Sequence, residues 1–204
     1  MDAPPPWKRP DEWPLPIYTD RLELRFPRHE DAQQLFDAVD ANRAAIIQWM
    51  PWPKTENLSV GQAHYTIESF VRATKNDLPA NLPIFIIDRE SGRYLGGTGL
   101  HDFHPDRHQA ETGYWVVQDR NNEGICTEAV IGLTEAAFRP QAEGGFGLRR
   151  MEIRCAAANV GSSRVAEKAG YMLEGTLRSH YWVEGKGWSD SLIFGTTADT
   201  WKKP

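Results

Sequence analysis

The chain has 204 residues, 40% of them hydrophobic and 25% charged, which are ordinary values for a globular protein. Its formal net charge of -5 gives no electrostatic argument for binding nucleic acid or an acidic membrane surface. No apolar run reaches the roughly 18 residues of a transmembrane helix, and the first residues lack the apolar segment of a signal peptide. We therefore expect a cytoplasmic protein without nucleic-acid or membrane partners.

The cysteines and histidines predict neither a disulfide framework nor a metal site. The two cysteines, Cys126 and Cys155, are too few to cross-link a chain of this size. Cys155 alternates with Met151 and Ile153 and is expected to point inward with them. One stretch that reads as a loop holds His101, His104 and His108. It does not supply the further ligands that a zinc ion requires.

The first 16 residues hold six prolines and predict an extended N-terminal arm, ordered where it docks on the rest of the chain. Trp7 and Trp13 are the candidates for anchoring this arm. Residues 17–204 are expected to form a single domain, because neither a repeat nor a linker-like stretch divides them.

The elements after the arm begin with a strand over 19–25, where apolar and polar residues alternate. Apolar residues at helical spacing over 32–39 predict the first helix. The segment 49–53 contains two prolines, which break helix and sheet alike. A second helix is expected from Ser59, where Gln62 completes a capping box.

The remainder of the chain predicts mainly strands, interrupted by two more helices. Strands are expected over 84–87, 94–100, 112–117, 149–157, 171–180 and 189–197, and helices over 124–138 and 162–169. Gly170 follows the last helix where a left-handed C-terminal cap is expected. This order predicts an α+β (mixed α/β) fold with a largely antiparallel sheet.

A strand, a polar loop and a helix start stand together in the middle of the chain. The strand Glu111–Val117 leads through the loop to the helix that begins at Gly124. A helix start presents unpaired backbone N–H groups and the positive end of the helix dipole, and a glycine lets an anion approach closely. The spacing predicts a phosphate cradle, although it matches neither a Walker loop nor a dinucleotide-binding glycine loop.

Six sequence blocks, taken in order, resemble the RimJ/RimL-type branch of the GNAT acetyltransferases. The resemblance spans roughly residues 17–200, and its blocks are residues 19–25, 48–52, 111–115, 124–129, 159–162 and 169–175. It implies the GNAT fold, a twisted, mostly antiparallel sheet with helices on both faces. In that fold the sheet is splayed between its fourth and fifth strands, and acetyl-CoA lies in the cleft.

The resemblance also implies which residues hold acetyl-CoA. Backbone groups of Val116 and Val117 would pair with the pantetheine arm, and the pyrophosphate motif falls on Asn121, Asn122, Glu123, Gly124, Ile125 and Cys126, followed by Thr127. Asn121 stands in place of Gln or Arg, Asn122 where relatives have Gly, and Cys126 in place of the small last residue. Backbone N–H groups make the main contacts and are supplied by any residue except proline. We therefore expect binding to persist.

Acetyl transfer to an amine needs a base for the amine proton and stabilisation of the oxyanion and of the departing thiolate. The resemblance implies Glu111 as the base, Ser162 as the hydrogen-bond partner of the sulfur, and Asn159 as a pantetheine ligand. Simpler interpretations stand beside these. Ser162 is also a suitable helix N-cap, and a glutamate at a strand start is commonly a solvated edge residue.

Aromatic residues and histidines are the candidates for binding the acceptor amine. Trp49 and Trp52 line an acceptor pocket or form a lid packed on the core, and Tyr114 belongs to the cleft wall. His101 and His180 are alternative bases, because an imidazole titrates near neutrality.

These inferences predict an acetyl-CoA-dependent N-acetyltransferase that needs no metal. The acceptor is a primary amine, either a protein N-terminus or a small molecule, attacked directly in a ternary complex, and the protein is a monomer or a homodimer. The alternatives are a non-catalytic acyl-CoA-binding regulatory module and an anion-binding domain unrelated to CoA.

Overall fold

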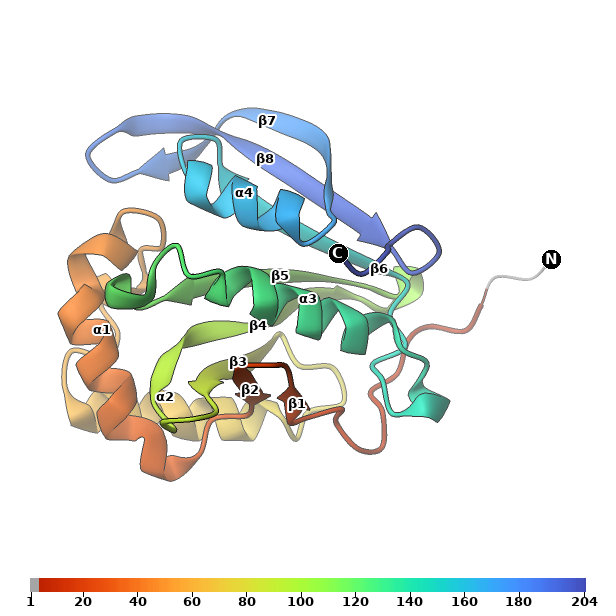
Figure 1. Cartoon of the computed structure of the whole chain (residues 1–204), viewed down its shortest axis with the longest axis horizontal. Helices are drawn as coiled ribbons and strands as arrows, with labels where there is room; N and C mark the ends of the chain where they lie inside the picture. The colour runs from red at the N-terminus through yellow and green to blue at the C-terminus, as the bar shows by residue number, and fades with distance from the viewer. Residues whose placement is uncertain (1–3) are drawn as a thin grey trace.

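The computed structural model describes residues 4–204, so the first three residues of the predicted arm lie outside the described residues. The backbone forms one eight-stranded sheet in the order β1-β2-β3-β4-β5-β6-β8-β7, shown in Figure 1. All neighbouring strands are antiparallel except β5 and β6, which run parallel. This mixed α+β architecture is the one that the sequence predicted.

The strands occur in the predicted order, with one addition at the start. They are β1 (Ile17–Tyr18), β2 (Leu22–Arg25), β3 (Asn81–Asp88), β4 (Tyr94–His104), β5 (Gln109–Val116), β6 (Arg150–Ala156), β7 (Met172–Val183) and β8 (Gly187–Thr197). The strand predicted over 19–25 begins only at Leu22, because Thr19 N donates to Leu22 O and closes a turn between β1 and β2. The predicted loop around the histidines is also wrong in part, since β4 continues through His101 to His104.

Helices cover both faces of the sheet. They are α1 (Ala32–Ile47), α2 (Val60–Ala73), α3 (Ile125–Phe138) and α4 (Val160–Lys168). The Ser59 hydroxyl accepts from Gln62 N at 3.2 Å, so the predicted cap of α2 is confirmed. Gly170, with φ of 82°, ends the last helix as predicted. Among the described residues, no helix combines the length and apolarity needed to cross a membrane.

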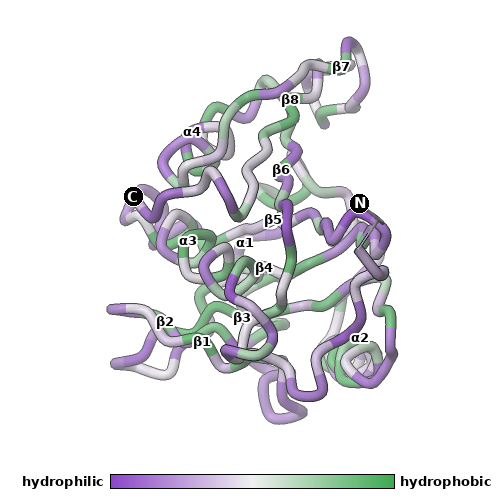
Figure 2. Tube along the Cα trace, turned by 90° about the vertical axis from the view of Figure 1, so that its right-hand side faces the viewer, coloured by the Kyte–Doolittle hydropathy of each residue, from purple (hydrophilic) through white to green (hydrophobic). Residues whose placement is uncertain are grey.

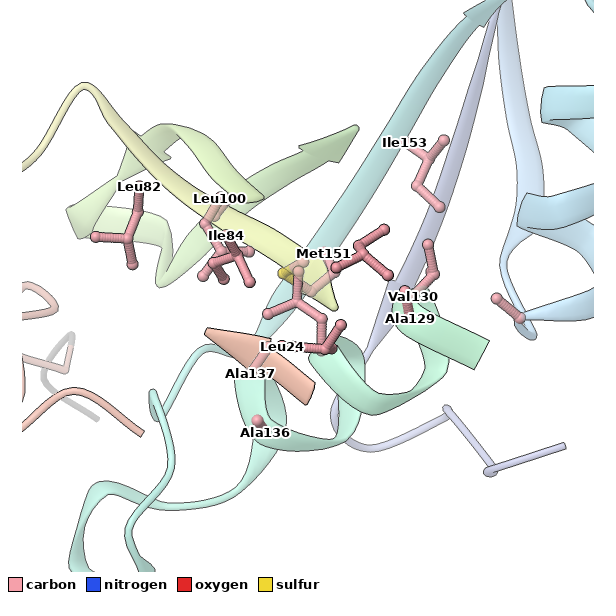
Figure 3. Close-up of a cluster of buried hydrophobic side chains, with 14 of the residues drawn as sticks. Leu24, Leu82, Ile84, Leu100, Ala129, Val130, Ala136, Ala137, Met151 and Ile153 are labelled. Atoms are coloured by element: carbon pink, nitrogen blue, oxygen red, sulfur yellow. The ribbon is translucent and has the colours of Figure 1, made fainter. Parts of the chain in front are cut away.

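The core has two parts because the side chains of β3 alternate between the faces of the sheet. Ile84 and Ile86 pack with α3 and α4, whereas Phe85 and Ile87 pack with α1 and α2. Figure 3 shows the first cluster, where Leu24 and Met151 meet the inner side of α3. Figure 2 shows hydrophobic residues concentrated in the interior strands and in α3.

The predicted arm docks through both of its tryptophans. Trp7 is 5% exposed, its indole N–H donates to Phe146 O at 2.7 Å, and its ring stacks on Phe103. The Trp13 indole donates to Thr74 O at 2.8 Å, at the end of α2. The arm therefore joins segments that are distant in the sequence.

The sheet opens between β5 and β6. These strands pair over three residues, ending at Glu111 opposite Glu152, while β5 continues along β4 to Val116. Beyond Glu111 the two strands therefore part. The predicted opening between the fourth and fifth strands is confirmed, and it falls between β5 and β6 because the short β1 adds one strand to the count. Figure 1 shows β6, β7, β8 and α4 as the upper part of the molecule.

Candidate active site

A cavity of about 530 Å³ occupies the opening, between the start of α3, the start of α4 and the end of α1. Its lining includes most residues predicted to bind the donor, namely Val116, Asn121, Asn122, Gly124, Ile125, Cys126, Thr127, Asn159 and Ser162, and two predicted for the acceptor, Trp49 and Tyr114. Six predicted residues lie outside this lining: Glu111, Val117, Glu123, Trp52, His101 and His180. The structure thus brings together segments that the sequence connected only through a resemblance.

The start of α3 forms the predicted cradle. Gly124 is the N-cap residue with φ of 80°, and it has no side chain with which to cap the helix. The first intrahelical bond of α3 is Glu128 N to Gly124 O, so the N–H groups of Ile125, Cys126 and Thr127 have no intrahelical acceptor. These donors face a cavity at the positive end of a helix of 14 residues, which suits a phosphate group.

The loop before α3 adopts the geometry that its residues tolerate. Asn122 has φ of 65°, the left-handed conformation that asparagine adopts more readily than other non-glycine residues. The Glu123 carboxylate is turned to Arg120, whose Nε lies 2.7 Å away, and the side chain lies outside the cavity lining. The Arg120 guanidinium therefore offsets the negative charge of Glu123, which would otherwise disfavour a bound anion.

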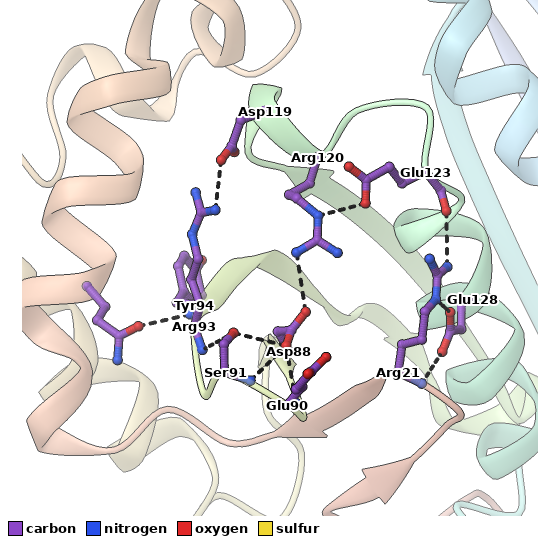
Figure 4. A network of polar contacts seen from close by, with 11 residues as sticks. Arg21, Asp88, Glu90, Ser91, Arg93, Tyr94, Asp119, Arg120, Glu123 and Glu128 are labelled. Carbon is purple, nitrogen blue, oxygen red and sulfur yellow. Dashed lines mark hydrogen bonds and ion pairs between the residues drawn. The ribbon is translucent and has the colours of Figure 1, made fainter.

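Ion pairs hold this loop to the sheet, as Figure 4 shows. Arg120 also contacts Asp88 at 3.2 Å, at the end of β3. Arg21 pairs with Glu128 at 2.7 Å and donates to Glu123 O at 3.1 Å. Burial raises the pKa of Glu128, but hydrogen bonds from Thr19 and Arg21 and the charge of Arg21 bring it below its ordinary value. These contacts tie the first turn of α3 to the turn before β2.

Backbone groups of β5 face the opening, but the structure narrows which ones. Val117 N donates to Leu95 O at 2.8 Å, and Val117 O accepts from Arg120 N at 3.1 Å. Both backbone groups of Val117 are thus bonded within the chain, contrary to its predicted role. Bonding alternates along an antiparallel pair, so the N–H and C=O of Val116, opposite Gly96, point toward the side that β6 has left.

Ser162 and Tyr114 meet at the α4 side of the cavity. The Ser162 hydroxyl lies 3.2 Å from the Tyr114 hydroxyl, which donates to Ser162 O at 2.8 Å. The capping interpretation of Ser162 is wrong, because Asn159 is the N-cap and its Oδ1 accepts from Ser162 N at 3.1 Å. Because Asn159 Oδ1 already accepts from the helix, the donor that this side chain can offer to a ligand is its amide NH2 group.

Both cysteines are near this cavity and remain protonated at neutral pH. Cys126 lines the cavity, and burial raises the pKa of its thiol to about 12. Cys155 is half-buried rather than fully inward, and burial raises its pKa as well. These thiols are poor nucleophiles as they stand, because the thiolate is the reactive form.

Glu111 lies at the point where β5 and β6 part. Its side chain is 15% exposed and pairs through Oε2 with Nε of Arg154 at 3.0 Å. Burial raises the pKa of Glu111 to about 7, Arg154 opposes this effect, and the carboxylates of Asp102 and Glu152 add to it. A carboxyl group that titrates near neutral pH is suited to accept a proton from an amine.

His101 lies beside Glu111, directly opposite it on β4. Burial lowers the pKa of His101, an effect that Asp102 counteracts and Arg154 reinforces. A Cβ atom at Gly113 would lie 3.6 Å from His101 Nε2, which places the imidazole over this glycine. Two proton-accepting groups thus share one face of the β4–β5 pair.

The aromatic residues of the α1–α2 connection take different positions. Trp49 lines the cavity, and its carbonyl accepts from the Tyr181 hydroxyl at 2.5 Å. Trp52 instead packs on Trp115, with ring centroids 6.2 Å apart. Trp49 therefore has the predicted pocket position, whereas Trp52 belongs to the packing beneath it. His180 lies on β7, where its Nδ1 is 3.0 Å from the Ser191 hydroxyl.

Sequence reasoning missed the cations and the α1 residues of the site. Arg120, Arg164 and Lys168 line the cavity, as does Asn42. Arg164 and Lys168 are four residues apart on α4, so their shared helix face was a usable signal. The pairing of Arg154 with Glu111 had no signal in the sequence, because it joins two strands across the opening.

Known acetyltransferases resemble this chain in sequence and in fold. The Escherichia coli ribosomal-protein-serine acetyltransferase is 26% identical over 160 residues, which are 78% of this chain and 84% of that protein. The structure of Mycobacterium smegmatis RimJ in complex with CoA-disulfide has a TM-score of 0.78 at 24% identity, covering 92% of this chain and 89% of that one. The microcin self-immunity acetyltransferase MccE, in complex with acetyl-CoA and AMP, has a TM-score of 0.76 at 22% identity, over 88% and 93% of the chains. These two structures share the fold.

The acetyltransferase (GNAT) domain family matches residues 21–172, which include β2 to β6 and the whole cradle. The RimJ/RimL-like resemblance of the sequence is confirmed by these matches. The chain therefore belongs to the GNAT acetyltransferase family, whose members use acetyl-CoA as the acetyl donor.

Proposed function

We propose that this acetyltransferase acts on a protein N-terminal amine. The observation that carries the proposal is the position of Glu111, a largely buried carboxyl group at the point where β5 and β6 part. Burial raises its pKa to about 7. The printed name of the Escherichia coli relative, a ribosomal-protein-serine acetyltransferase, supports a protein acceptor.

The two partners of the reaction approach from opposite faces of the sheet in this proposal. Acetyl-CoA lies in the cavity on the α3 and α4 side, with its phosphates on the N–H groups of Ile125 to Thr127 and its pantetheine arm along Val116. Arg164 and Lys168 add positive charge beside it. The acceptor reaches the opening from the face of Glu111, which alternation along β5 assigns to the α1 and α2 side together with Trp115.

The chemistry assigns a task to each side. The amine nitrogen forms a bond to the thioester carbon, the bond between that carbon and sulfur breaks, and Glu111 takes the proton that the amine releases. In this proposal the Ser162 and Tyr114 hydroxyl groups donate to the departing sulfur in place of their present acceptors, Tyr114 Oη and Ser162 O. Burial raises the pKa of Tyr114 above its ordinary value, so Tyr114 keeps its proton at neutral pH and can act as a donor.

The test uses purified protein, acetyl-CoA and three acceptors: a peptide with a free N-terminus, the same peptide blocked by acetylation, and a set of small amines. We expect thiol release and a peptide heavier by one acetyl group with the free peptide alone. Transfer to small amines but not to peptides would contradict the proposed acceptor. Tight CoA binding without transfer to any amine would favour the regulatory module, and calorimetry without CoA binding would favour the anion-binding domain.

A further inference from the structure

The face of β6 that carries Arg154 bears a row of alternating charges. Arg150 lies 2.8 Å from Glu152, and Arg154 lies 3.2 Å from the other oxygen of Glu152. The row is extended at one end by Glu174, which accepts from Arg150, and at the other by Glu111. Each guanidinium therefore stands between two carboxylates.

The last pair of this row crosses the opening of the sheet. Glu111 and Glu152 are the final residues that β5 and β6 place side by side, and like charges in neighbouring positions repel each other. Arg154 comes from β6, beyond that point, and its guanidinium contacts both carboxylates. Its bond to Glu111 consequently joins the two parts of the sheet where they separate.

We propose that Arg154 is a positioning residue for Glu111, holding Oε2 across the opening so that Oε1 takes the proton of the acceptor amine, while Glu152 limits this hold by sharing the guanidinium. The inference rests on the proposed role of Glu111 as the base. It assigns to β6 a task that the cavity lining does not reveal, because Arg154, Glu152 and Glu111 all lie outside that lining.

The charged groups around Glu111 determine in which direction each substitution should shift its pKa. Arg154 and Glu152 face it from β6, and Asp102 and His101 face it from β4. Burial and the two carboxylates favour the protonated form of Glu111, whereas Arg154 favours the ionised form. The Arg154 side chain is 39% exposed, so water screens part of its effect.

Substitutions at Arg154 and at Glu152 are expected to move the titration of Glu111 in opposite directions. Arg154→Met removes the positive charge that lowers the pKa of Glu111, so the acidic limb of the kcat/KM profile moves to higher pH, by about one unit. Glu152→Gln removes a carboxylate that raises this pKa and leaves Arg154 to Glu111 alone. The limb then moves to lower pH. Arg154→Lys keeps the charge and is expected to restore most of the wild-type profile.

The experiment measures kcat/KM for one acceptor peptide against pH in the wild type and these three variants. Arg139→Met is the matched control, because Arg139 pairs with Glu135 on α3 at 3.7 Å and takes no part in the row. Opposite shifts in Arg154→Met and Glu152→Gln, with an unmoved limb in the control, are expected. A uniform loss of rate with unmoved limbs would overturn the proposal, since that is the result of a purely structural role.

A carboxyl ¹³C NMR titration gives the second readout without acetyl transfer. The signal of Glu111 is identified by its loss in Glu111→Gln and is then followed in folded wild type, Arg154→Met and Glu152→Gln. If the wild type shows no transfer at all, the proposed function fails, while the NMR shifts still test the contact. If the wild type transfers acetyl groups and neither limb nor signal moves, the inference about Arg154 fails alone.

Discussion

The two sides of the opening, which we propose for the donor and for the acceptor, are built from different chemical groups. On the donor side, N–H groups at the start of α3 and the backbone of Val116 face the cavity. On the acceptor side, the groups suited to chemistry are the side chains of Glu111 and His101, set by partners on neighbouring strands. A site made of backbone tolerates substitution, whereas a site made of side chains depends on each residue.

This difference explains why the off-pattern motif still forms a cradle. Asn121, Asn122 and Cys126 depart from the family motif, yet Asn122 adopts the required left-handed backbone. None of the three is a proline, so each still supplies an N–H group. The acceptor side offers no such freedom, because its chemistry depends on the side chain of one residue, Glu111. Burial and neighbouring charges set the pKa of that carboxyl group near neutrality.

The largest effect is expected from the acceptor side. Glu111→Gln removes the base and should lower kcat by about 100-fold or more at pH 8, with little change in the Kd for acetyl-CoA. Because the pKa of Glu111 is about 7, the wild type loses its base below that pH, and the ratio of the two rates should shrink there. Initial rates measured against pH give kcat, and calorimetry gives the Kd for acetyl-CoA. A kcat equal to that of the exposed control Glu143→Gln would remove Glu111 from the base role.

The second-largest effect is expected from a substitution that disturbs the backbone at the start of α3, on the donor side. Gly124 has φ of 80°, where a branched side chain costs about 1–2 kcal/mol, so Gly124→Val should displace the first turn of α3. We expect the Kd for CoA to rise about tenfold or more, measured by calorimetry. Gly144→Val is the matched control, because Gly144 has φ of 74° with open space around it, outside the cavity. Equal affinities in the two variants would place the cradle elsewhere.

The third effect concerns the hydroxyl pair at the leaving group. Tyr114→Phe and Ser162→Ala should each lower kcat about fivefold to tenfold, since each removes one hydrogen-bond donor. The two hydroxyl groups are 3.2 Å apart, so the double variant should lose less than the product of the single losses. Independent, multiplicative losses in this kinetic cycle would show that the pair does not act together.

The smallest effect is expected from removing a negative charge on the donor side. Glu123 holds Arg120 at 2.7 Å, so Glu123→Gln should free this guanidinium for a phosphate and lower the Kd for CoA about twofold to fivefold. The gain should decrease in high salt. Glu143→Gln removes the same charge from an exposed position outside the cavity. An equal gain in that control would mean that net charge, rather than Arg120, is responsible.

The order of the elements was predictable because each carries its own local pattern. The cap of α2 at Ser59, the helix that begins after Gly124 and the stop at Gly170 all rest on residues within one or two turns. Predictions failed where a distant partner decides the outcome. His101 belongs to a strand because β3 and β5 pair with β4 on both sides, and Val117 is bonded to Leu95 through that same pairing.

The sequence by itself determined the family, the succession of strands and helices, and the free N–H groups at the start of α3, because these depend on local periodicity, capping and backbone conformation. The tertiary structure alone decided the environment of Glu111, the pairing of Ser162 with Tyr114 and the bridge made by Arg154. These features arise where β5 and β6 part and bring distant residues within hydrogen-bonding distance. Burial and neighbouring charge then set the chemistry of each group, and the residue type alone determines neither of them.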